Sequence, residues 1–275
     1  PYPENIFIHS MGPDNYMSII NPELEVYWQI NSNLFGIDFK ENNNQLSYFN
    51  KNTLNSDNAH WIVANDQMQE TDSLICTSGL TDYHDIRVLN NGGYIIQSYD
   101  SLFVNMEGLV EGGFPGANVK GILRLQEFDS SHNLILDWLA FDHLNIADYT
   151  NLNLTTPQII WMHGNSIDID SDNNLIISNR RSSEIIKINR TSGEIIWILG
   201  GPLNEFEILN DPLNGFSKQH DARRLTNGNL LLFDNGNGHQ PSLSRVVEYG
   251  LNETNKTATL VWEFHQPDQL IALSM

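Results

Sequence analysis

The stretch Gln219 to Gly238 reads Gln-His-Asp-Ala-Arg-Arg-Leu-Thr-Asn-Gly-Asn-Leu-Leu-Leu-Phe-Asp-Asn-Gly-Asn-Gly. Asn227-Gly228 separates two short runs of strand-forming residues, and Asn-Gly accepts the positive φ angles of a tight turn. The stretch therefore predicts a β-hairpin. His220 stands just before its first strand, and a glycine-rich loop, residues 234–238, follows its second.

The same pattern occurs twice earlier in the chain. Residues 83–96 contain His84 at the same offset from an Asn-Gly turn and repeat the His-Asp pair. Residues 162–178 contain His163, and there we expect a longer turn at residues 171–174. Three histidines thus occupy one repeat position.

A second pair of strands, ending in a tryptophan, follows each of these hairpins. Each unit therefore consists of four antiparallel strands. Units of this kind repeated in series are typical of a β-propeller, in which the blades are arranged around a central channel. The second pairs are Gly121–Phe128 with Leu134–Trp138, Glu184–Asn189 with Glu194–Ile198, and Ser244–Tyr249 with Ala258–Phe264.

The fold class predicted is all-β, with one propeller domain over residues 1–275. The expected blades are a half blade at 14–30, whole blades at 33–78, 83–142, 161–201 and 219–264, and the start of a further blade at 265–275. A propeller usually closes by pairing strands from both chain ends. Because the half blade lacks its inner strands, we expect the chain to be part of a longer polypeptide.

Composition excludes several classes of partner. A formal net charge of −20 argues against binding to nucleic acid or to an anionic membrane surface. Cys76 is the only cysteine, so neither an internal disulfide nor a thiolate metal cluster can form. No apolar segment is long enough to span a bilayer, which predicts no membrane insertion.

The three repeat histidines are the first candidates for function. In a propeller the innermost strands line the channel, so His84, His163 and His220 are expected to meet at one mouth of it. The alternative is that each histidine caps its hairpin by bonding to backbone.

Arginines form a second set of candidates. Lys and Arg together number only 14, yet several arginines lie in or beside the repeats. A guanidinium group fits an oxyanion with two parallel hydrogen bonds, so these positions indicate an anionic ligand. Pairing with neighbouring acids is the alternative for each of them. The arginines are Arg180, Arg181, Arg223, Arg224 and Arg245.

A metal site and a cofactor are not expected. The alternating carboxylates of Asp168, Asp170 and Asp172 resemble a calcium loop, but the bidentate Glu and central Gly of an EF-hand are missing. A polar hairpin turn is the better interpretation. The sequence also has no zinc spacing and no phosphate-binding loop before a helix.

Several motifs in order resemble the arylsulfotransferase family. The resemblance is dense from about residue 160 to 264 and extends more thinly to about residue 80. The motifs are His163-Gly-Asn-Ser166, Ile177-Ser-Asn-Arg180, Gly193-Glu-Ile-Ile-Trp-Ile-Leu-Gly-Gly201, Gln219-His-Asp-Ala222, Phe233-Asp-Asn-Gly236 and Ser244-Arg-Val-Val-Glu-Tyr249.

The resemblance implies a six-bladed propeller in the periplasm or outside the cell. It implies transfer of a sulfuryl group from a phenolic sulfate ester to a phenol through a sulfohistidine, without a cofactor. His163, His220 and His239 are the implied catalytic residues, with His239 where the family has an arginine. His84, Asn165, Arg180, Asn235 and Arg245 are the expected substrate-binding residues.

The nucleophilic histidine of the family belongs to a blade beyond the Ser244–Tyr249 strand, and no histidine of this chain matches it. Two hypotheses therefore stay open. One is an extracytoplasmic enzyme acting on aryl sulfates and phenols. The other is a non-catalytic secreted propeller used for binding or surface assembly. A quinone- or calcium-dependent propeller enzyme is a third, weaker alternative.

Overall fold

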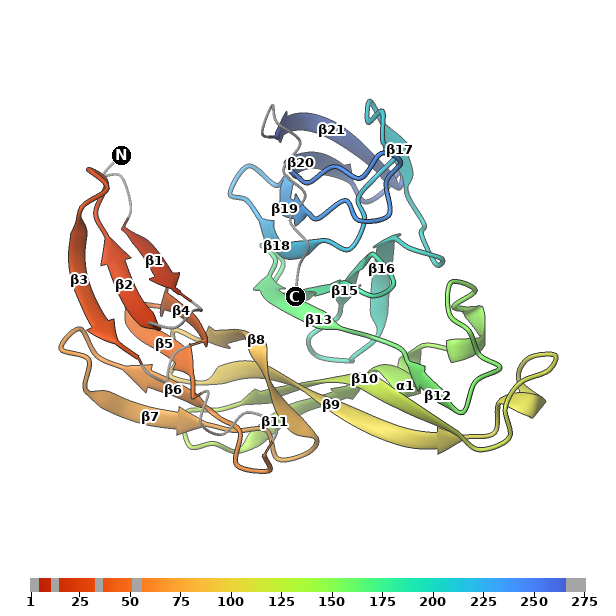
Figure 1. The fold of residues 1–275 in the computed structure, drawn as a ribbon, viewed down its shortest axis with the longest axis horizontal. Helices are drawn as coiled ribbons and strands as arrows, with labels where there is room; N and C mark the ends of the chain where they lie inside the picture. Colours follow the sequence, from red (N-terminus) through yellow and green to blue (C-terminus); the bar gives the residue numbers. More distant parts are fainter. Residues whose placement is uncertain (1–4, 11–14, 33–36, 51–55, 266–275) are drawn as a thin grey trace. The chain divides into compact units, whose positions relative to one another are not determined.

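The computed structural model describes residues 5–10, 15–32, 37–50 and 56–265. Its strands form five sheets (Figure 1). The chain is an all-β propeller with a pattern of four-stranded antiparallel blades, so the predicted fold class is confirmed. The first residues of the blades expected from 14 and 33, and residues 266–275 of the expected further blade, lie outside the described ranges.

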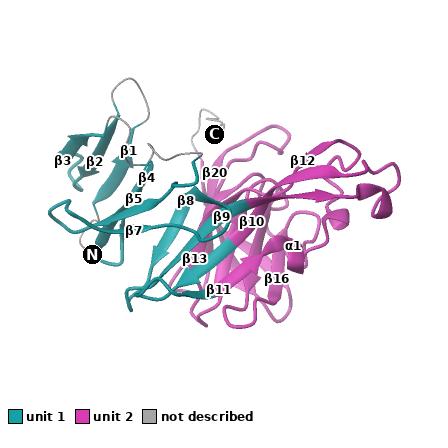
Figure 2. Cartoon of the chain, turned by 90° about the horizontal axis from the view of Figure 1, so that it is seen from below, with its two compact units in different colours: residues 1–99, 125–135 teal, residues 100–124, 136–275 magenta. Residues whose placement is uncertain are grey.

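The chain divides into two compact units (Figure 2). Unit 1 comprises residues 1–99 and 125–135, and unit 2 comprises residues 100–124 and 136–275. Each unit has its own clusters of buried hydrophobic side chains.

Unit 1 contains two complete sheets. The first has the order β1-β2-β3, and β2 and β3 are the two strands expected in the half blade, whereas β1 was not predicted. The second has the order β4-β5-β6-β7. The strands are β1 (Ile6–His9), β2 (Tyr16–Ile20), β3 (Val26–Asn31), β4 (Ile37–Asn42), β5 (Gln45–Phe49), β6 (Trp61–Ala64) and β7 (Glu70–Leu74).

The third sheet has the order β11-β10-β9-β8, and the division between the units passes through it. A short strand, β12 (Gln158–Ile160), runs parallel to β10. The other strands are β8 (Leu80–Val88), β9 (Tyr94–Val104), β10 (Ala117–Phe128) and β11 (Leu134–Leu139). Within residues 56–265, three short helices lie in the connections, α1 (Ala140–His143) and two 3-10 turns at Met106–Gly108 and Ile146–Asp148.

Unit 2 contains the two sheets that follow. One has the order β13-β14-β15-β16, and the other has β18 to β21 in order with β17 parallel to β21 at its edge. The strands are β13 (Gly164–Ile169), β14 (Leu175–Asn179), β15 (Glu184–Ile188), β16 (Ile195–Gly200), β17 (Glu207–Leu209), β18 (His220–Arg224), β19 (Leu230–Asp234), β20 (Arg245–Asn252) and β21 (Thr257–Phe264).

The hairpin turns are alike in all three repeats. In the turn that follows β18, the N–H of Gly228 donates to the Leu225 carbonyl (2.9 Å), and Gly228 has φ of +86°. The turn after β13 has the same bonds, with Asn173 at φ of +66° in the place of the glycine. The prediction of a longer turn there is wrong, because the additional residues lie between His163 and the turn.

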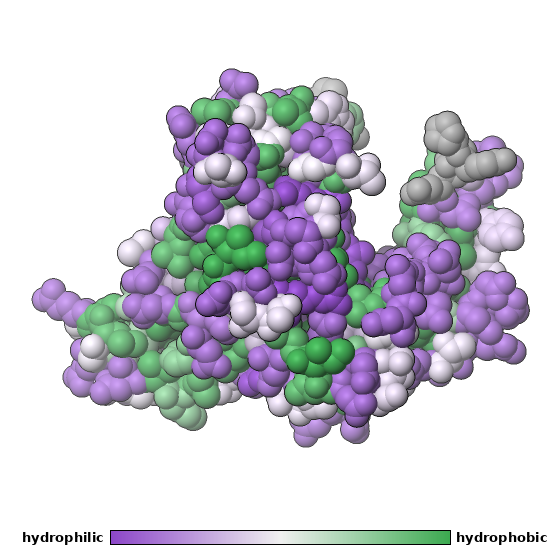
Figure 3. Space-filling view, turned by 180° about the vertical axis from the view of Figure 1, so that it is seen from behind, coloured by the Kyte–Doolittle hydropathy of each residue, from purple (hydrophilic) through white to green (hydrophobic). Residues whose placement is uncertain are grey.

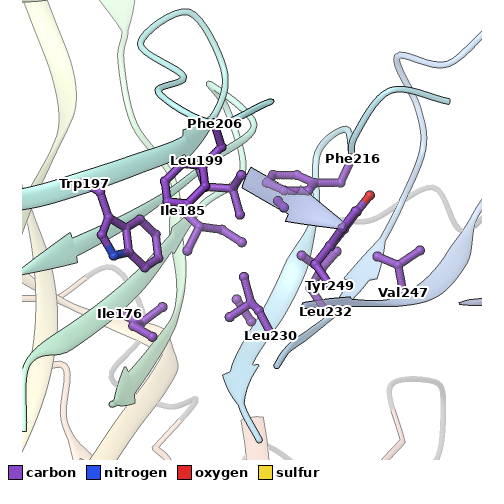
Figure 4. Close-up of a cluster of buried hydrophobic side chains, with 12 residues drawn as sticks. Ile176, Ile185, Trp197, Leu199, Phe206, Phe216, Leu230, Leu232, Val247 and Tyr249 are labelled. Atoms are coloured by element: carbon purple, nitrogen blue, oxygen red, sulfur yellow. The ribbon is translucent and has the colours of Figure 1, made fainter. Parts of the chain in front are cut away.

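The core of unit 2 lies between its two sheets (Figure 4). Trp197 and Leu199 of one sheet face Leu230 and Tyr249 of the other, and all four are almost fully buried. Burying each such side chain contributes about 1.5–3 kcal/mol, so this cluster is a main source of the unit's stability.

The outer surface is largely polar on the face drawn in Figure 3, where hydrophobic side chains form small areas. Among the described residues there is no helix whose length and apolarity would let it cross a bilayer.

Candidate active site

His163 is fixed by backbone contacts where β13 begins and β14 ends. Its N–H donates to Oδ1 of Asn179 (2.8 Å), and its carbonyl accepts from the N–H of Arg180 (2.8 Å). Asn179 is fully buried, so an amide side chain in the protein interior determines where the backbone of His163 lies.

His220 is the first residue of β18, and Gln219 before it is held from three sides. The buried Gln219 Nε2 donates to Oγ of Ser178 (3.0 Å) and to the carbonyl oxygens of Asn179 (3.2 Å) and Glu184 (2.9 Å). Buried amides are costly without such partners, so these bonds fix the entry of the strand.

Two side chains of β13 tie it to β18, its neighbour in Figure 1. Nδ2 of Asn165 donates to the Gln219 carbonyl (2.8 Å), and Oγ of Ser166 accepts from the N–H of Ala222 (3.0 Å). His163 and His220 are therefore both anchored on Asn179, one through its side chain and the other through Gln219. The structure thus links the backbone at these two predicted residues through Asn179 of unit 2.

The imidazole of His220 has a defined orientation. Its Nδ1 donates to Oδ1 of Asn235 (2.6 Å), because an amide oxygen can only accept. Neutral His220 therefore carries its lone pair on Nε2, where it can act as a base, and protonated His220 can donate from Nε2. Asn235, expected to bind substrate, orients His220 with this oxygen.

His239 lies in the loop that follows β19. Its Nε2 donates to Oδ2 of Asp234 (2.8 Å), a carboxylate with a fully buried side chain. The Nε of Arg245 donates to the same oxygen (3.0 Å). Asp234 therefore links His239 to the interior of the blade.

Arg245 forms a buried ion-pair network. Its guanidinium binds both oxygens of Asp211 (2.9 Å each), Oε2 of Glu263 (2.9 Å) and the Gly215 carbonyl (2.8 Å). Burial alone would lower the pKa of Arg245, but these carboxylates raise it. Pairing with acids, the alternative weighed for each arginine, is what the structure shows at Arg245.

Arg180 follows Asn179 directly and lies in the turn between β14 and β15. Burial, and then the charge of Arg181, lower the pKa of Arg180. Lys218, which the sequence analysis did not single out, is near both arginines, and its pKa is lowered by burial and then by their charges. The sequence signal that could have pointed to Lys218 is its position directly before the Gln219-His220 motif.

Asn165, predicted to bind substrate, is nearly fully buried. In the described part of the chain its Oδ1 has no hydrogen-bond partner. This oxygen can accept a hydrogen bond from a hydroxyl group of a ligand.

Glu184 is a buried carboxylate that the sequence analysis missed. It accepts from Oγ of Ser182 (2.5 Å), which in turn accepts from Nδ2 of Asn179 (2.5 Å). Burial raises the pKa of Glu184 to about 7, against these hydrogen bonds, which lower it. Nδ2 of Asn179 also donates directly to Oε2 of Glu184 (3.5 Å), so a titrating group contacts the side chain that holds His163.

His84 belongs to unit 1. Its Nδ1 donates to Oδ1 of Asp82 (2.8 Å), and its ring stacks on Tyr83. Burial alone would lower the pKa of His84, but the nearby carboxylates, Asp82 foremost with Asp38 and Asp85, together raise it. The predicted meeting of His84 with the other two histidines involves both units and stays a prediction.

The acidic turn after β13 is occupied by cations of the chain itself. Asp170 binds Nζ of Lys187 (2.8 Å) and Nε of Arg224 (3.0 Å), and Asp172 also binds Lys187 (2.7 Å). In the described ranges, no cluster of His, Cys, Asp and Glu has a geometry suited to a metal ion.

Unit 2 thus combines two anchored histidines, a third that pairs with a buried aspartate, amide side chains and a group of cations. Within a β-propeller, this set suits proton transfer and the binding of an anionic group. The arylsulfotransferase (ASST) family model matches residues 52–269, and the chain belongs to this family.

Solved structures with the same fold differ widely in sequence. A protein of unknown function from Bacteroides caccae is 12% identical with a TM-score of 0.51, covering 96% of this chain and 74% of its own. A hypothetical selenium-binding protein from Sulfolobus tokodaii is 12% identical with a TM-score of 0.54, covering 96% of this chain and 64% of its own. These likenesses show the fold alone. No curated protein matches the chain.

Proposed function

We propose that the protein transfers a sulfuryl group from an aryl sulfate to a phenol, in the periplasm or outside the cell. The observation that supports this most is the joint anchoring of His163 and His220 on Asn179. These contacts fix the backbone at both histidines, and Asn235 orients the His220 ring. The two imidazoles can then donate hydrogen bonds to peripheral sulfuryl oxygens, where charge develops during transfer.

The proposed reaction has two steps. In the first, a histidine nitrogen attacks sulfur, the bond from sulfur to the phenolic oxygen breaks, and the phenolate leaves with a proton from an acid group. In the second, the oxygen of another phenol attacks the sulfohistidine, its proton passes to a base, and the histidine is released. The resemblance to the family implies a nucleophile beyond the Ser244–Tyr249 strand.

The chain's own residues have distinct roles in this proposal. His220 exchanges a proton at Nε2, because Asn235 holds its Nδ1. Asn165 accepts a hydrogen bond from the phenol through Oδ1. His239 donates toward anionic oxygens when it is protonated, and Asp234 fixes its position.

The test uses full-length protein with 4-nitrophenyl sulfate and phenol, and it measures nitrophenol release. We expect His220→Ala to lower kcat/KM roughly 100-fold or more, since general acid-base groups contribute about that much. His132→Ala is the matched control, because His132 lies in a turn of unit 1 and pairs with Asp72.

Equal rates for the unmodified protein and His220→Ala would refute the proposal. They would favour a propeller that binds ligands without catalysis. Labelled donor without phenol should leave a radiolabelled intermediate on the protein. If acid releases the label, as it does from phosphohistidine, the covalent step is supported.

A further inference from the structure

Three buried polar side chains lie in and beside the turn between β14 and β15. This buried network consists of Asn179, Ser182 and Glu184. Nδ2 of Asn179 donates to Oγ of Ser182 (2.5 Å), and that hydroxyl donates to Oε2 of Glu184 (2.5 Å). Nδ2 of Asn179 also donates to the same carboxylate oxygen (3.5 Å). Buried polar groups with several mutual hydrogen bonds are held in one arrangement.

The carboxylate sets the direction of these hydrogen bonds. Because a carboxylate can only accept, the one hydroxyl proton of Ser182 points at Glu184, and the Ser182 oxygen accepts from Asn179. Nδ2 of Asn179 must therefore face Ser182, so its Oδ1 faces the N–H of His163 (2.8 Å). The reverse orientation of this amide would place two donors against each other at His163 and acceptors against each other at Glu184.

The buried network is fixed in place by its surroundings. Nε2 of Gln219 donates to the carbonyl oxygens of both Asn179 (3.2 Å) and Glu184 (2.9 Å), so the two ends of the network share one partner. Gly201 packs against the other side, where an added Cβ would lie 2.3 Å from Cγ of Glu184. The carboxylate therefore has little room to move away from Ser182.

We propose that Ser182 and Glu184 are positioning residues for His163, because they select the orientation of the Asn179 amide that holds its backbone. They act through Asn179 and not by contact with substrate. Without the acceptor at Glu184, the Ser182 hydroxyl can turn toward Asn179, and the amide can reverse. The His163 N–H would then lose its acceptor. The effect on turnover rests on the proposed function, whereas the effect on this N–H does not.

The first test measures hydrogen exchange of the His163 N–H by NMR in the full-length protein. It is made at pH 8, where Glu184 is largely ionised because burial raises its pKa only to about 7. Glu184→Leu removes the acceptor, whereas Glu184→Gln keeps an oxygen that can accept from Ser182. Exchange should be about tenfold faster in Glu184→Leu than in Glu184→Gln, which corresponds to one lost hydrogen bond.

The N–H of Leu232, a buried residue of the other sheet in unit 2, is the internal reference for this measurement. Its exchange should be the same in the two variants. Equal exchange at His163 in both variants would overturn the inference. Equal acceleration at His163 and Leu232 would overturn it too, because it would show a general loss of stability.

The second test is nitrophenol release from 4-nitrophenyl sulfate. Ser182→Ala should lower kcat/KM about tenfold, and Ser182→Thr, which keeps the hydroxyl, should recover most of the loss. Ser47→Ala is the matched control, because Ser47 of unit 1 is equally buried and accepts from Nδ2 of Asn42 (3.3 Å). Equal rates for Ser182→Ala and the unmodified protein would overturn the positioning role.

The two tests separate this inference from the proposed function. If the unmodified protein releases no nitrophenol while exchange at His163 still differs between Glu184→Leu and Glu184→Gln, the proposed function fails. The control of His163 by the buried network then stands.

Discussion

At the scale of the residue, the sequence predicts the histidines of unit 2 better than it predicts the residues that hold them in place. His163 and His220 could be found because each stands before the first strand of a repeated hairpin. Asn179 lies in a motif that was recognised, yet its role depends on contacts with residues far away in the chain. The environment of Arg245 was equally inaccessible, because its partner Asp211 lies 34 positions earlier and no periodicity connects them.

Glu184 allows a prediction about pH. Burial raises its pKa from 4.5 in the unfolded chain to about 7, so the folded protein binds a proton more tightly. The stabilising contribution of the protonated form is complete below pH 4.5 and is lost as pH rises through 7. Glu184→Gln, which stays neutral, should thus unfold with a free energy about 2 kcal/mol higher than the unmodified protein at pH 8.

Urea denaturation at pH 5 and pH 8 measures this effect. The two proteins should be close in stability at pH 5 and should separate as the pH rises. Glu194→Gln is the control, because Glu194 is an exposed residue that leads into β16. Parallel curves for Glu184→Gln and the unmodified protein would show that Glu184 does not titrate between these values.

At the scale of the element, strands joined by a recognisable hairpin turn could be predicted, whereas the short strands at sheet edges could not. The repeated turn needs one residue at positive φ, and Gly92, Asn173 and Gly228 supply it. Sequence reasoning recognised the Asn-Gly pairs but misjudged the turn at Asn173. Glycine is the usual sign of a residue at positive φ, whereas asparagine adopts this conformation less often. Strands β1, β12 and β17 have three or four residues each, too few for an alternating pattern to emerge.

Gly236 is the element-scale test of the loop that carries Asn235 and His239. Both Gly236 and Gly228 have positive φ, but a Cβ at Gly236 would lie 1.7 Å from the Leu243 carbonyl, whereas Gly228 has nothing within 4 Å. Gly228→Ala should cost about 1 kcal/mol of unfolding free energy, from its φ alone. Gly236→Ala should cost at least about 3 kcal/mol, from strain and collision together.

Urea denaturation of both variants measures their stability, and nitrophenol release measures their transfer activity. Gly236→Ala should lose transfer activity even where it is still folded, since the loop must move away from Leu243. Comparable stability of the two alanine variants would mean that the close approach of the backbone does not constrain the loop.

At the scale of the whole molecule, the blade pattern could be predicted because each blade carries its own turn and second strand pair. The division into two units could not, since it passes through the strands of the β8–β11 sheet rather than through a linker. The polar surface and the charge of −20 follow from composition directly.

The excess negative charge predicts a response to salt. Mutual repulsion of surface carboxylates disfavours the folded state, and added salt screens it, while buried pairs such as Arg245 with Asp211 are screened much less. The Tm should therefore rise by several degrees between low salt and about 0.5 M NaCl. A Tm that falls over this range, followed by circular dichroism, would mean that surface ion pairs outweigh the repulsion.

The ties from Asn165 and Ser166 to the strand bearing His220 have an evolutionary consequence. Since side chains of one blade fix the backbone on both sides of His220 in the next blade, the smallest unit that carries this site is a pair of neighbouring blades. Gene rearrangements that insert or delete a blade between them would separate the histidines while leaving each hairpin able to fold. Propellers that change blade number elsewhere along the chain would retain them.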